Sequence, residues 1–134
     1  MWIHYRTGYK YQTSRPYYHR LKNGIESSAA IDTEFLSLRD GILTIKPGYA
    51  WDGPSGPTID TKNFMRGSLV HDALYQLIRE GHLPRGAKVS ADNELRDVCI
   101  EDGMTRARAW WVHLAVHRFG HSATISSRQE YCAP

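Results

Sequence analysis

A chain of 134 residues has the length of one compact domain, and 41% apolar with 23% charged residues is typical of an ordinary soluble globular protein. Its formal net charge of +3 is only mildly basic, which is typical of a solvated surface and also suits an anionic partner such as lipid headgroups, cell-wall polymer or nucleic acid. No apolar run reaches the length of a transmembrane segment.

The ends of the chain and its two cysteines carry little functional signal. Residues 1–6 show no basic stretch followed by an apolar one, so we expect no secretory signal and folding in a cytoplasm. Cys99 lies in a helical pattern and Cys132 lies close to the last residue. Two cysteines so far apart define no disulfide framework, and both are expected to be free thiols.

The first part of the chain favours β-structure. Residues 2–5 and 17–21 are typical of short strands, and residues 22–24 of a turn. Aromatic and basic side chains mix between residues 9 and 20, as they do in a half-buried sheet with one wet face. A stacking platform for nucleic acid is the less favoured interpretation of this segment.

A hairpin is the clearest local prediction. Asp40-Gly41 stands between the apolar runs 35–38 and 42–45, and glycine tolerates the positive φ that a tight hairpin turn needs. Residues 48–60 then form a loop rich in glycine and proline, whose glycines allow close approach of a ligand and whose carbonyls are free to bind one. A plain connector is the alternative.

Three helical patterns follow the loop, over residues 61–80, 90–103 and 105–120. The chain is therefore predicted to be an α+β protein, with an N-terminal β region and hairpin followed by three helices. The single domain 1–134 is expected to divide into a β region (1–47), a loop (48–60), a helical part (61–120) and a surface tail (121–134).

The first two helices carry the candidate site. Ser90 is typical of an N-cap, which places Asp92 and Glu94 in the first turn of the second helix. His71 and Tyr75 share one face of the first helix because they are four residues apart. Asp92 is the expected partner of the His71 ring, which leaves the other ring nitrogen as a base. Tyr75 is expected to donate its hydroxyl to Asp92.

Asp72 follows His71 directly and points about 100° away from it around the helix. It is expected to face the loop at 51–56, where a carboxylate and several carbonyls make an all-oxygen site that suits Ca²⁺ better than Zn²⁺. The alternative is structural: His71 belongs to a buried hydrogen-bond network and Asp72 pairs with Arg66 or Arg96.

Several of these motifs together resemble a family of small uncharacterised bacteriophage and prophage proteins, a domain of unknown function. The similarity covers roughly residues 40–120 and lies in Trp51-Asp52-Gly53-Pro54-Ser55, Arg66, the segment 69–75, Ala91-Asp92 and the segment 112–120. It implies a phage protein made in the host cytoplasm, with the virion as a further location.

The order of a glycine-containing loop, a His-Asp-x-x-Tyr helix and an Ala-Asp pair is also similar to phospholipase A2, closest to the small disulfide-poor form in parvovirus capsids. That resemblance implies a base (His71), two residues that orient it (Asp92, Tyr75) and Ca²⁺ ligands (Asp72 and carbonyls near Trp51, Gly53 and Ser55). The metal would polarise the ester carbonyl.

The loop departs from the phospholipase pattern. It carries an acidic Asp52, and Pro57 follows Gly56 where the phospholipase pattern is richer in glycine. A carboxylate at Asp52 indicates either a different metal or a structural pair with Arg66.

Three functions follow from these patterns. The first is a phage-encoded, Ca²⁺-dependent hydrolase in which His71 activates water to attack an ester of host-envelope phospholipid. The second is a non-catalytic head- or tail-associated protein that binds other virion proteins and uses the His-Asp network for folding. The third is a zinc-dependent envelope hydrolase that uses His71, Asp72 and Asp52. Nucleic acid is the least favoured partner.

The last helical pattern carries two further clusters. His113, His117 and His121 recur every four residues, which is more typical of a wet helix edge than of a zinc site. Trp110 and Trp111 are typical of a core residue and a rim residue. The alternative is an interfacial role beside three basic residues, Arg106, Arg108 and Arg118.

Overall fold

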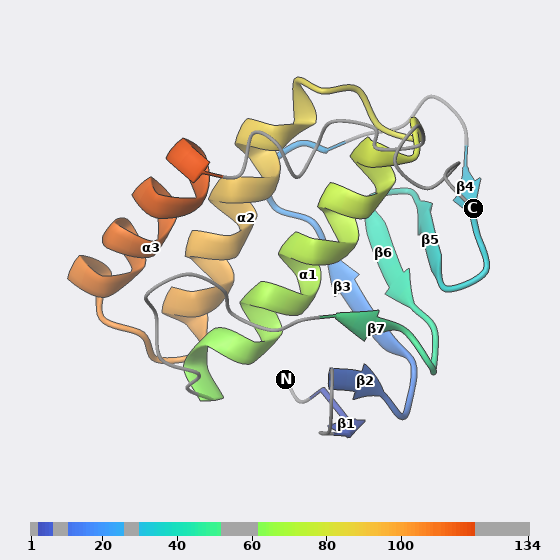
Figure 1. Ribbon diagram of the computed structural model, residues 1–134, viewed down its shortest axis with the longest axis horizontal. Helices are drawn as coiled ribbons and strands as arrows, with labels where there is room; N and C mark the ends of the chain where they lie inside the picture. Colours follow the sequence, from blue (N-terminus) through green and yellow to red (C-terminus); the bar gives the residue numbers. More distant parts are fainter. Residues whose placement is uncertain (1–2, 7–10, 26–29, 52–61, 120–134) are drawn as a thin grey trace, which may run out of the picture.

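The computed structural model describes residues 3–6, 11–25, 30–51 and 62–119 (Figure 1). Two antiparallel sheets come first and three helices follow, which confirms the predicted α+β class. The strands are β1 (Tyr5–Arg6), β2 (Tyr11–Thr13), β3 (Tyr17–Arg20), β4 (Ile31–Asp32), β5 (Leu36–Arg39), β6 (Ile42–Ile45) and β7 (Ala50–Trp51). The helices are α1 (Lys62–Arg79), α2 (Ala87–Glu101) and α3 (Arg106–Phe119).

The two sheets differ in size. Strands β1, β2 and β7 form a small sheet in that order, and β3, β6, β5 and β4 form a four-stranded sheet. Strands β2, β4 and β7 were not expected from the sequence, and β7 occupies residues 50–51 of the predicted loop. Each of these strands has only two or three residues, which is too short for a period-two pattern to be recognised.

The predicted hairpin is confirmed. Strands β5 and β6 pair antiparallel, with Leu38 opposite Leu43, and the turn between them contains Asp40 (φ 53°) and Gly41 (φ 77°). Two consecutive positive φ angles match the right-handed twist of the strands on either side of a tight turn. The local sequence therefore determines this part of the sheet.

One face of the larger sheet is buried. Side chains of β3, β5 and β6 alternate between buried and more exposed positions, and the inward residues include Leu36, Leu43 and Ile45, all fully buried. They pack with the apolar side of α1 into one core cluster. The same alternation turns Tyr17 and His19 of β3 inward, so two polar groups enter the core.

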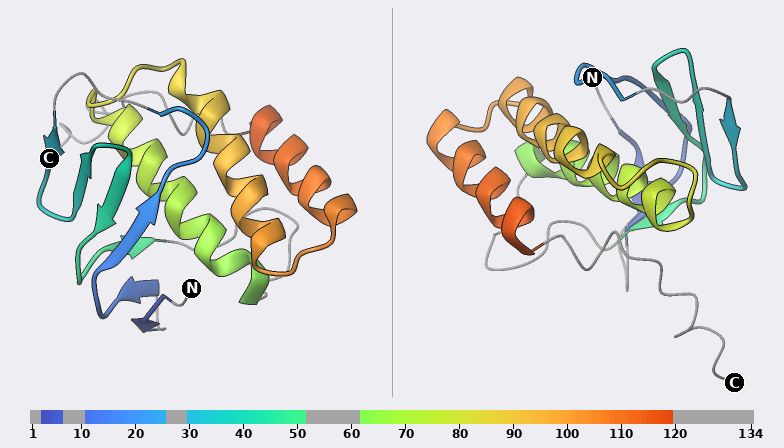
Figure 2. Two further views of the ribbon diagram at one scale, coloured as in Figure 1. Left: turned by 180° about the vertical axis from the view of Figure 1, so that it is seen from behind. Right: turned by 90° about the horizontal axis from the view of Figure 1, so that it is seen from above.

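The helices lie in chain order, with α1 nearest the sheets, α2 beside it and α3 at the outer edge (Figures 1 and 2). Helices α1 and α2 approach closely at Gly67, where an added Cβ would lie 2.7 Å from Cys99 Sγ and 3.0 Å from Leu95 Cδ1. Burial, together with the charge of Asp102, raises the pKa of the Cys99 thiol to about 12. The cysteine is a packing residue, as expected for a free buried thiol.

The start of α2 differs from the prediction. The helix begins at Ala87 after Gly86, and the cap position contributes no side-chain hydrogen bond. Ala87 N–H donates to the carbonyl of Pro84 at 3.0 Å, so the preceding turn already winds the chain into the helix. Ser90 is therefore an internal helix residue, and its assignment as N-cap is wrong. Asp92 consequently lies beyond the first turn.

Helix α3 begins after Thr105, whose Oγ1 accepts the N–H of Arg108 at 3.2 Å. The expectation that Trp110 and Trp111 form a core and rim pair is wrong, because these side chains are 62% and 44% exposed. Helix α3 contacts its neighbour α2 through a narrow side that includes the small buried residue Ala109. None of the described helices combines the length and apolar character that crossing a bilayer requires.

Candidate functional site

The centre of the candidate site is a histidine–carboxylate pair between α1 and α2. His71 Nε2 lies 2.8 Å from Asp92 Oδ1, and the two residues are 6% and 0% exposed. The predicted hydrogen bond is confirmed. Consecutive antiparallel helices bring residues 71 and 92 together because α1 and α2 are joined by a short connection.

Tyr75 completes the contact on the same carboxylate oxygen. Its hydroxyl donates to Asp92 Oδ1 at 2.5 Å, and its ring centroid lies 4.0 Å from that of His71. Burial and the nearby Asp92 carboxylate raise the pKa of Tyr75, so the phenol keeps its proton and acts as a donor. The predicted hydrogen bond from Tyr75 is confirmed as well.

The second oxygen of Asp92 binds residues that sequence reasoning missed. Lys88 Nζ lies 3.0 Å from Asp92 Oδ2 and 3.1 Å from the carbonyl of His117. His117 Nδ1 lies 3.7 Å from the same Oδ2. The available signal for Lys88 was its position four residues before Asp92, a spacing that brings opposite charges together on a helix.

Charge distribution in the site follows from these contacts. Burial raises the pKa of Asp92, but donors from His71, Tyr75 and Lys88 outweigh it and hold the pKa below its ordinary value. Burial lowers the pKa of His71, but Asp72 and Asp92 outweigh it, and this pKa is raised. Asp92 therefore stays a carboxylate that only accepts, so His71 Nε2 carries a proton toward it. The lone pair of neutral His71 is then on Nδ1.

Asp72 lies on the Nδ1 side of His71. Its Oδ1 is 4.0 Å from Nδ1, beyond hydrogen-bond distance, and 37% of its side chain is exposed. The alternative pairing of Asp72 with Arg66 or Arg96 is wrong. Arg66 binds acidic groups at the end of α2, and Arg96 binds its neighbour Asp97 at 3.1 Å.

The predicted metal ligands are only partly described. Asp52, Gly53 and Ser55 lie outside the described residues, whereas Trp51 is buried at the end of β7. Trp51 Nε1 donates to Ser68 Oγ at 3.1 Å, three residues before His71 on α1. This bond holds the start of the predicted loop on the helix that carries the site.

The fit to a metal rests on Asp72. Within residues 3–6, 11–25, 30–51 and 62–119, no three His, Cys, Asp or Glu side chains gather as a metal site. A half-exposed carboxylate beside Nδ1 suits a hard cation, which takes its remaining oxygens from backbone and water. The Ca²⁺ and Zn²⁺ ligand sets remain predictions.

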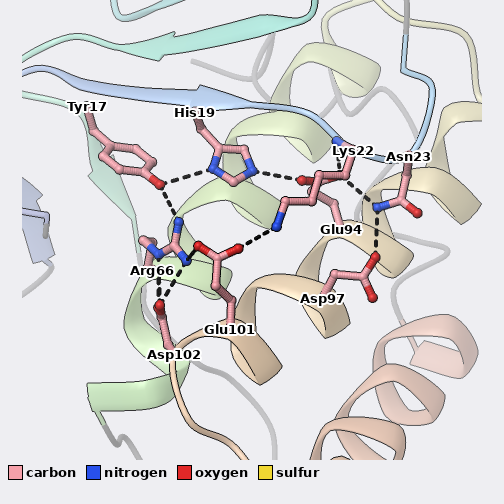
Figure 3. A network of polar contacts seen from close by, with 9 residues as sticks. All are labelled: Tyr17, His19, Lys22, Asn23, Arg66, Glu94, Asp97, Glu101 and Asp102. Carbon is pink, nitrogen blue, oxygen red and sulfur yellow. Dashed lines mark hydrogen bonds and ion pairs between the residues drawn. The ribbon is translucent and has the colours of Figure 1, made fainter. Parts of the chain in front are cut away.

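A second buried polar network lies between β3, α1 and the other side of α2 (Figure 3). His19 Nε2 lies 2.8 Å from Glu94 Oε2, and His19 Nδ1 lies 3.0 Å from the hydroxyl of Tyr17. Glu94 Oε1 also accepts the Lys22 N–H at 3.0 Å and Asn23 Nδ2 at 2.8 Å. Both nitrogens of His19 therefore have partners.

Arg66 extends this network to the end of α2 (Figure 3). It is 2% exposed and donates to Tyr17 at 2.7 Å, to Glu101 at 2.7 Å and to both oxygens of Asp102. Burial lowers the pKa of Arg66, but the hydrogen bonds that Arg66 donates to Asp102 and Tyr17 outweigh it, so the guanidinium stays charged. Sequence reasoning missed this network, although the alternation of Tyr17 and His19 with Tyr18 indicated which side chains turn inward.

The histidines of α3 form no described metal site. His113 Nε2 lies 2.8 Å from Asn93 Oδ1, and the rings of His113 and His117 are parallel with centroids 6.1 Å apart. The His117 side chain is 52% exposed, as expected for a wet helix edge. His121 lies outside the described residues.

Comparisons with known proteins identify no relative of this chain. Protein-family models, curated proteins and solved structures all gave no match.

Proposed function

We propose that this protein is a hydrolase in which His71 activates a water molecule for attack on an ester, with a phospholipid of the bacterial envelope as substrate. One observation carries the proposal. Asp92 binds Nε2 of His71, while Nδ1 has no hydrogen-bond partner among the described residues and lies beside the half-exposed Asp72. A histidine held on one nitrogen and open on the other is the arrangement that general-base catalysis needs.

In the proposed reaction, Nδ1 accepts a proton from water as the water oxygen bonds to the ester carbonyl carbon. The resulting imidazolium is stabilised by the Asp92 carboxylate, which Tyr75 and Lys88 hold in place. When the ester C–O bond breaks, Nδ1 returns the proton to the departing alkoxide, so His71 ends neutral. Bound Ca²⁺ would supply positive charge near the carbonyl oxygen.

The residues proposed to hold this cation are Asp72 and carbonyls near Trp51, Gly53 and Ser55. Asp52 is the loop residue that fits an otherwise neutral phospholipase-type loop least well. Its carboxylate favours a variant of this proposal, a zinc-dependent hydrolase that uses His71, Asp72 and Asp52. The phage origin rests on the sequence resemblance alone.

A second candidate is a non-catalytic virion or assembly protein. It is favoured by the completeness of the polar core: among the described residues, every side-chain nitrogen or oxygen atom that is itself shut off from solvent has a hydrogen-bond partner. In that case His71 and Asp92 serve folding, and the protein acts by binding other virion proteins.

Hydrolysis of phospholipid in mixed detergent micelles, with calcium and with a chelator, separates these functions. We expect calcium-dependent ester cleavage that His71→Gln abolishes, and a calcium-induced rise in Tm that Asp72→Asn removes. The matched control is His82→Gln in the turn that follows α1, since the His82 side chain is 41% exposed and takes no part in the site.

Three results would change the assignment. Stoichiometric zinc in the purified protein, with activity lost on zinc removal, would replace calcium by zinc. No cleavage of phospholipid in the micelles, together with no change in Tm on adding calcium, would refute the hydrolase proposal. Activity of His71→Gln equal to that of His82→Gln would do the same.

A further inference from the structure

The outer face of α3 exposes three large apolar side chains. Trp110 is 62% exposed, Trp111 44% and Leu114 37%. Leu114 lies four residues after Trp110 and three after Trp111, so the three side chains cover one patch of the helix surface. Such a contiguous apolar patch on a soluble domain marks an interaction site more often than scattered single residues do.

The position of α3 leaves this patch uncovered by the other described elements. Helix α3 lies at the edge of the helical layer and packs on α2 (Figures 1 and 2). Its buried side is formed by Ala109 and Val112, and the exposed patch points away from them. The apolar surface is therefore not needed for the fold.

Charge on α3 is of one sign. The helix sequence, RARAWWVHLAVHRF, contains no acidic residue. Arg106 and Arg118 are exposed near its two ends, and His117 is half exposed beside the patch. The nearest acidic residues before the helix, Glu101 and Asp102, are bound to Arg66. The partner of this face should therefore be anionic.

An anionic lipid surface matches both features. Tryptophan prefers the headgroup level of a bilayer, leucine the acyl boundary below it, and arginine the lipid phosphates. The 14 residues of α3 rise about 21 Å, less than the roughly 30 Å of a hydrocarbon core, so the helix would lie in the membrane plane. A second copy of the chain fits less well, since it would bring like charges together.

We propose that the outer face of α3, formed by Trp110, Trp111 and Leu114 beside Arg106, binds the surface of an anionic phospholipid bilayer. The inference goes beyond the proposed hydrolase, because it rests on α3 and holds whether or not His71 does chemistry.

Co-sedimentation with vesicles tests it. The vesicles contain ether-linked lipids without cleavable esters, either phosphatidylcholine alone or phosphatidylcholine and phosphatidylglycerol in equal amounts. We expect binding to the mixed vesicles, weakened at least about tenfold by the double substitution W110S/W111S and about fivefold by Arg106→Gln. Added salt should weaken binding, since the charge interaction is screened.

Two matched controls lie on the sheet. Tyr18→Ser removes an aromatic side chain that is 59% exposed on β3, and Arg39→Gln removes an exposed cation on β5. Both should bind like the wild type, and so should His71→Gln, which keeps vesicle binding separate from hydrolysis. Quenching of wild-type tryptophan fluorescence by brominated lipid gives a readout that depends on no variant.

Four outcomes would overturn the proposal. The first is equal vesicle binding by W110S/W111S and wild type, and the second is equal binding to vesicles with and without phosphatidylglycerol. The third is a protein that does not bind vesicles but forms a dimer that W110S/W111S dissociates. The fourth is a protein that does not bind vesicles but binds single-stranded DNA in a complex that W110S/W111S loses. A failure to detect ester hydrolysis would not by itself contradict the proposal that α3 binds a lipid surface.

Discussion

Helix α2 carries two buried carboxylates, and each contacts a histidine. They differ in how many ring nitrogens of that histidine have a hydrogen-bond partner among the described residues. Asp92 and Glu94 are both 0% exposed, and each lies 2.8 Å from a histidine nitrogen. Two residues apart on a helix, they point to different sides. Asp92 contacts α1 and α3, whereas Glu94 contacts β3 and the residues after it.

The two histidines differ in how many of their ring nitrogens form hydrogen bonds. His19 uses both ring nitrogens, one for Glu94 and one for Tyr17. His71 uses Nε2 for Asp92, and its Nδ1 faces Asp72 at 4.0 Å. A short, buried histidine–carboxylate bond is therefore common to a structural network and to the candidate site. The open nitrogen and the half-exposed carboxylate beside it distinguish the candidate site.

The sharpest test of this comparison is the same substitution at both carboxylates. Asp92→Asn should lower kcat/KM for ester cleavage about 10³-fold, because an amide no longer stabilises the imidazolium and can turn the ring to the wrong tautomer. Glu94→Gln should leave kcat/KM within about threefold of wild type, since His19 lies outside the site. Similar losses in both variants would show that the two networks act as one.

For stability the order of effects should be reversed: removing His19 should destabilise the fold more than removing His71. His19→Ala should lower the free energy of unfolding by about 3 kcal/mol, because Glu94 keeps only neutral donors from Lys22 N–H and Asn23. His71→Ala should cost less, since Asp92 keeps the Lys88 ammonium at 3.0 Å. Urea unfolding followed by circular dichroism measures both. A larger loss for His71→Ala would reverse the structural assignment.

The two tyrosines give a smaller contrast. Tyr17→Phe should cost about 2 kcal/mol, because it leaves both Arg66 and His19 without this hydroxyl. Tyr75→Phe should cost about 1 kcal/mol, because Asp92 loses one of several donors. The same urea experiment applies. Equal losses of stability in the two variants would indicate that the other donors to Asp92 do not compensate for the lost Tyr75 hydrogen bond.

The pH profile should show the smallest effect. The proposed base His71 can accept a proton only when it is neutral, and its pKa is raised above 6.5, so kcat/KM should rise with pH through an inflection above that value. By linkage, the stability that His71 contributes is complete below its unfolded pKa and is lost as the pH rises through the folded pKa.

Asp72→Asn removes one of the charges that raise the His71 pKa. It should therefore move the inflection to lower pH. The residual activity of this variant, followed across pH, checks the shift. An unmoved inflection would mean that Asp92 alone sets the pKa of His71.

Much of the fold and half of the candidate site follow from local sequence. The hairpin at Asp40-Gly41 depends on two positive φ angles that the dipeptide itself favours. The contact of His71 and Tyr75 with Asp92 was predictable, because helical spacing places the first two on one face and a short connection returns the chain as the next helix.

Tertiary structure decided the rest, because the partners are far apart along the chain. His19 and Glu94 are 75 residues apart, and Arg66 and Asp102 are 36 apart. Their contacts depend on how β3 lies against α2, which no local pattern encodes. The exposure of Trp110 likewise follows from the place of α3 at the edge of the helical layer. Local patterns were enough to predict the helical faces and the contacts of His71 and Tyr75 with Asp92, whereas packing set which polar residues became core and which aromatic ones stayed outside.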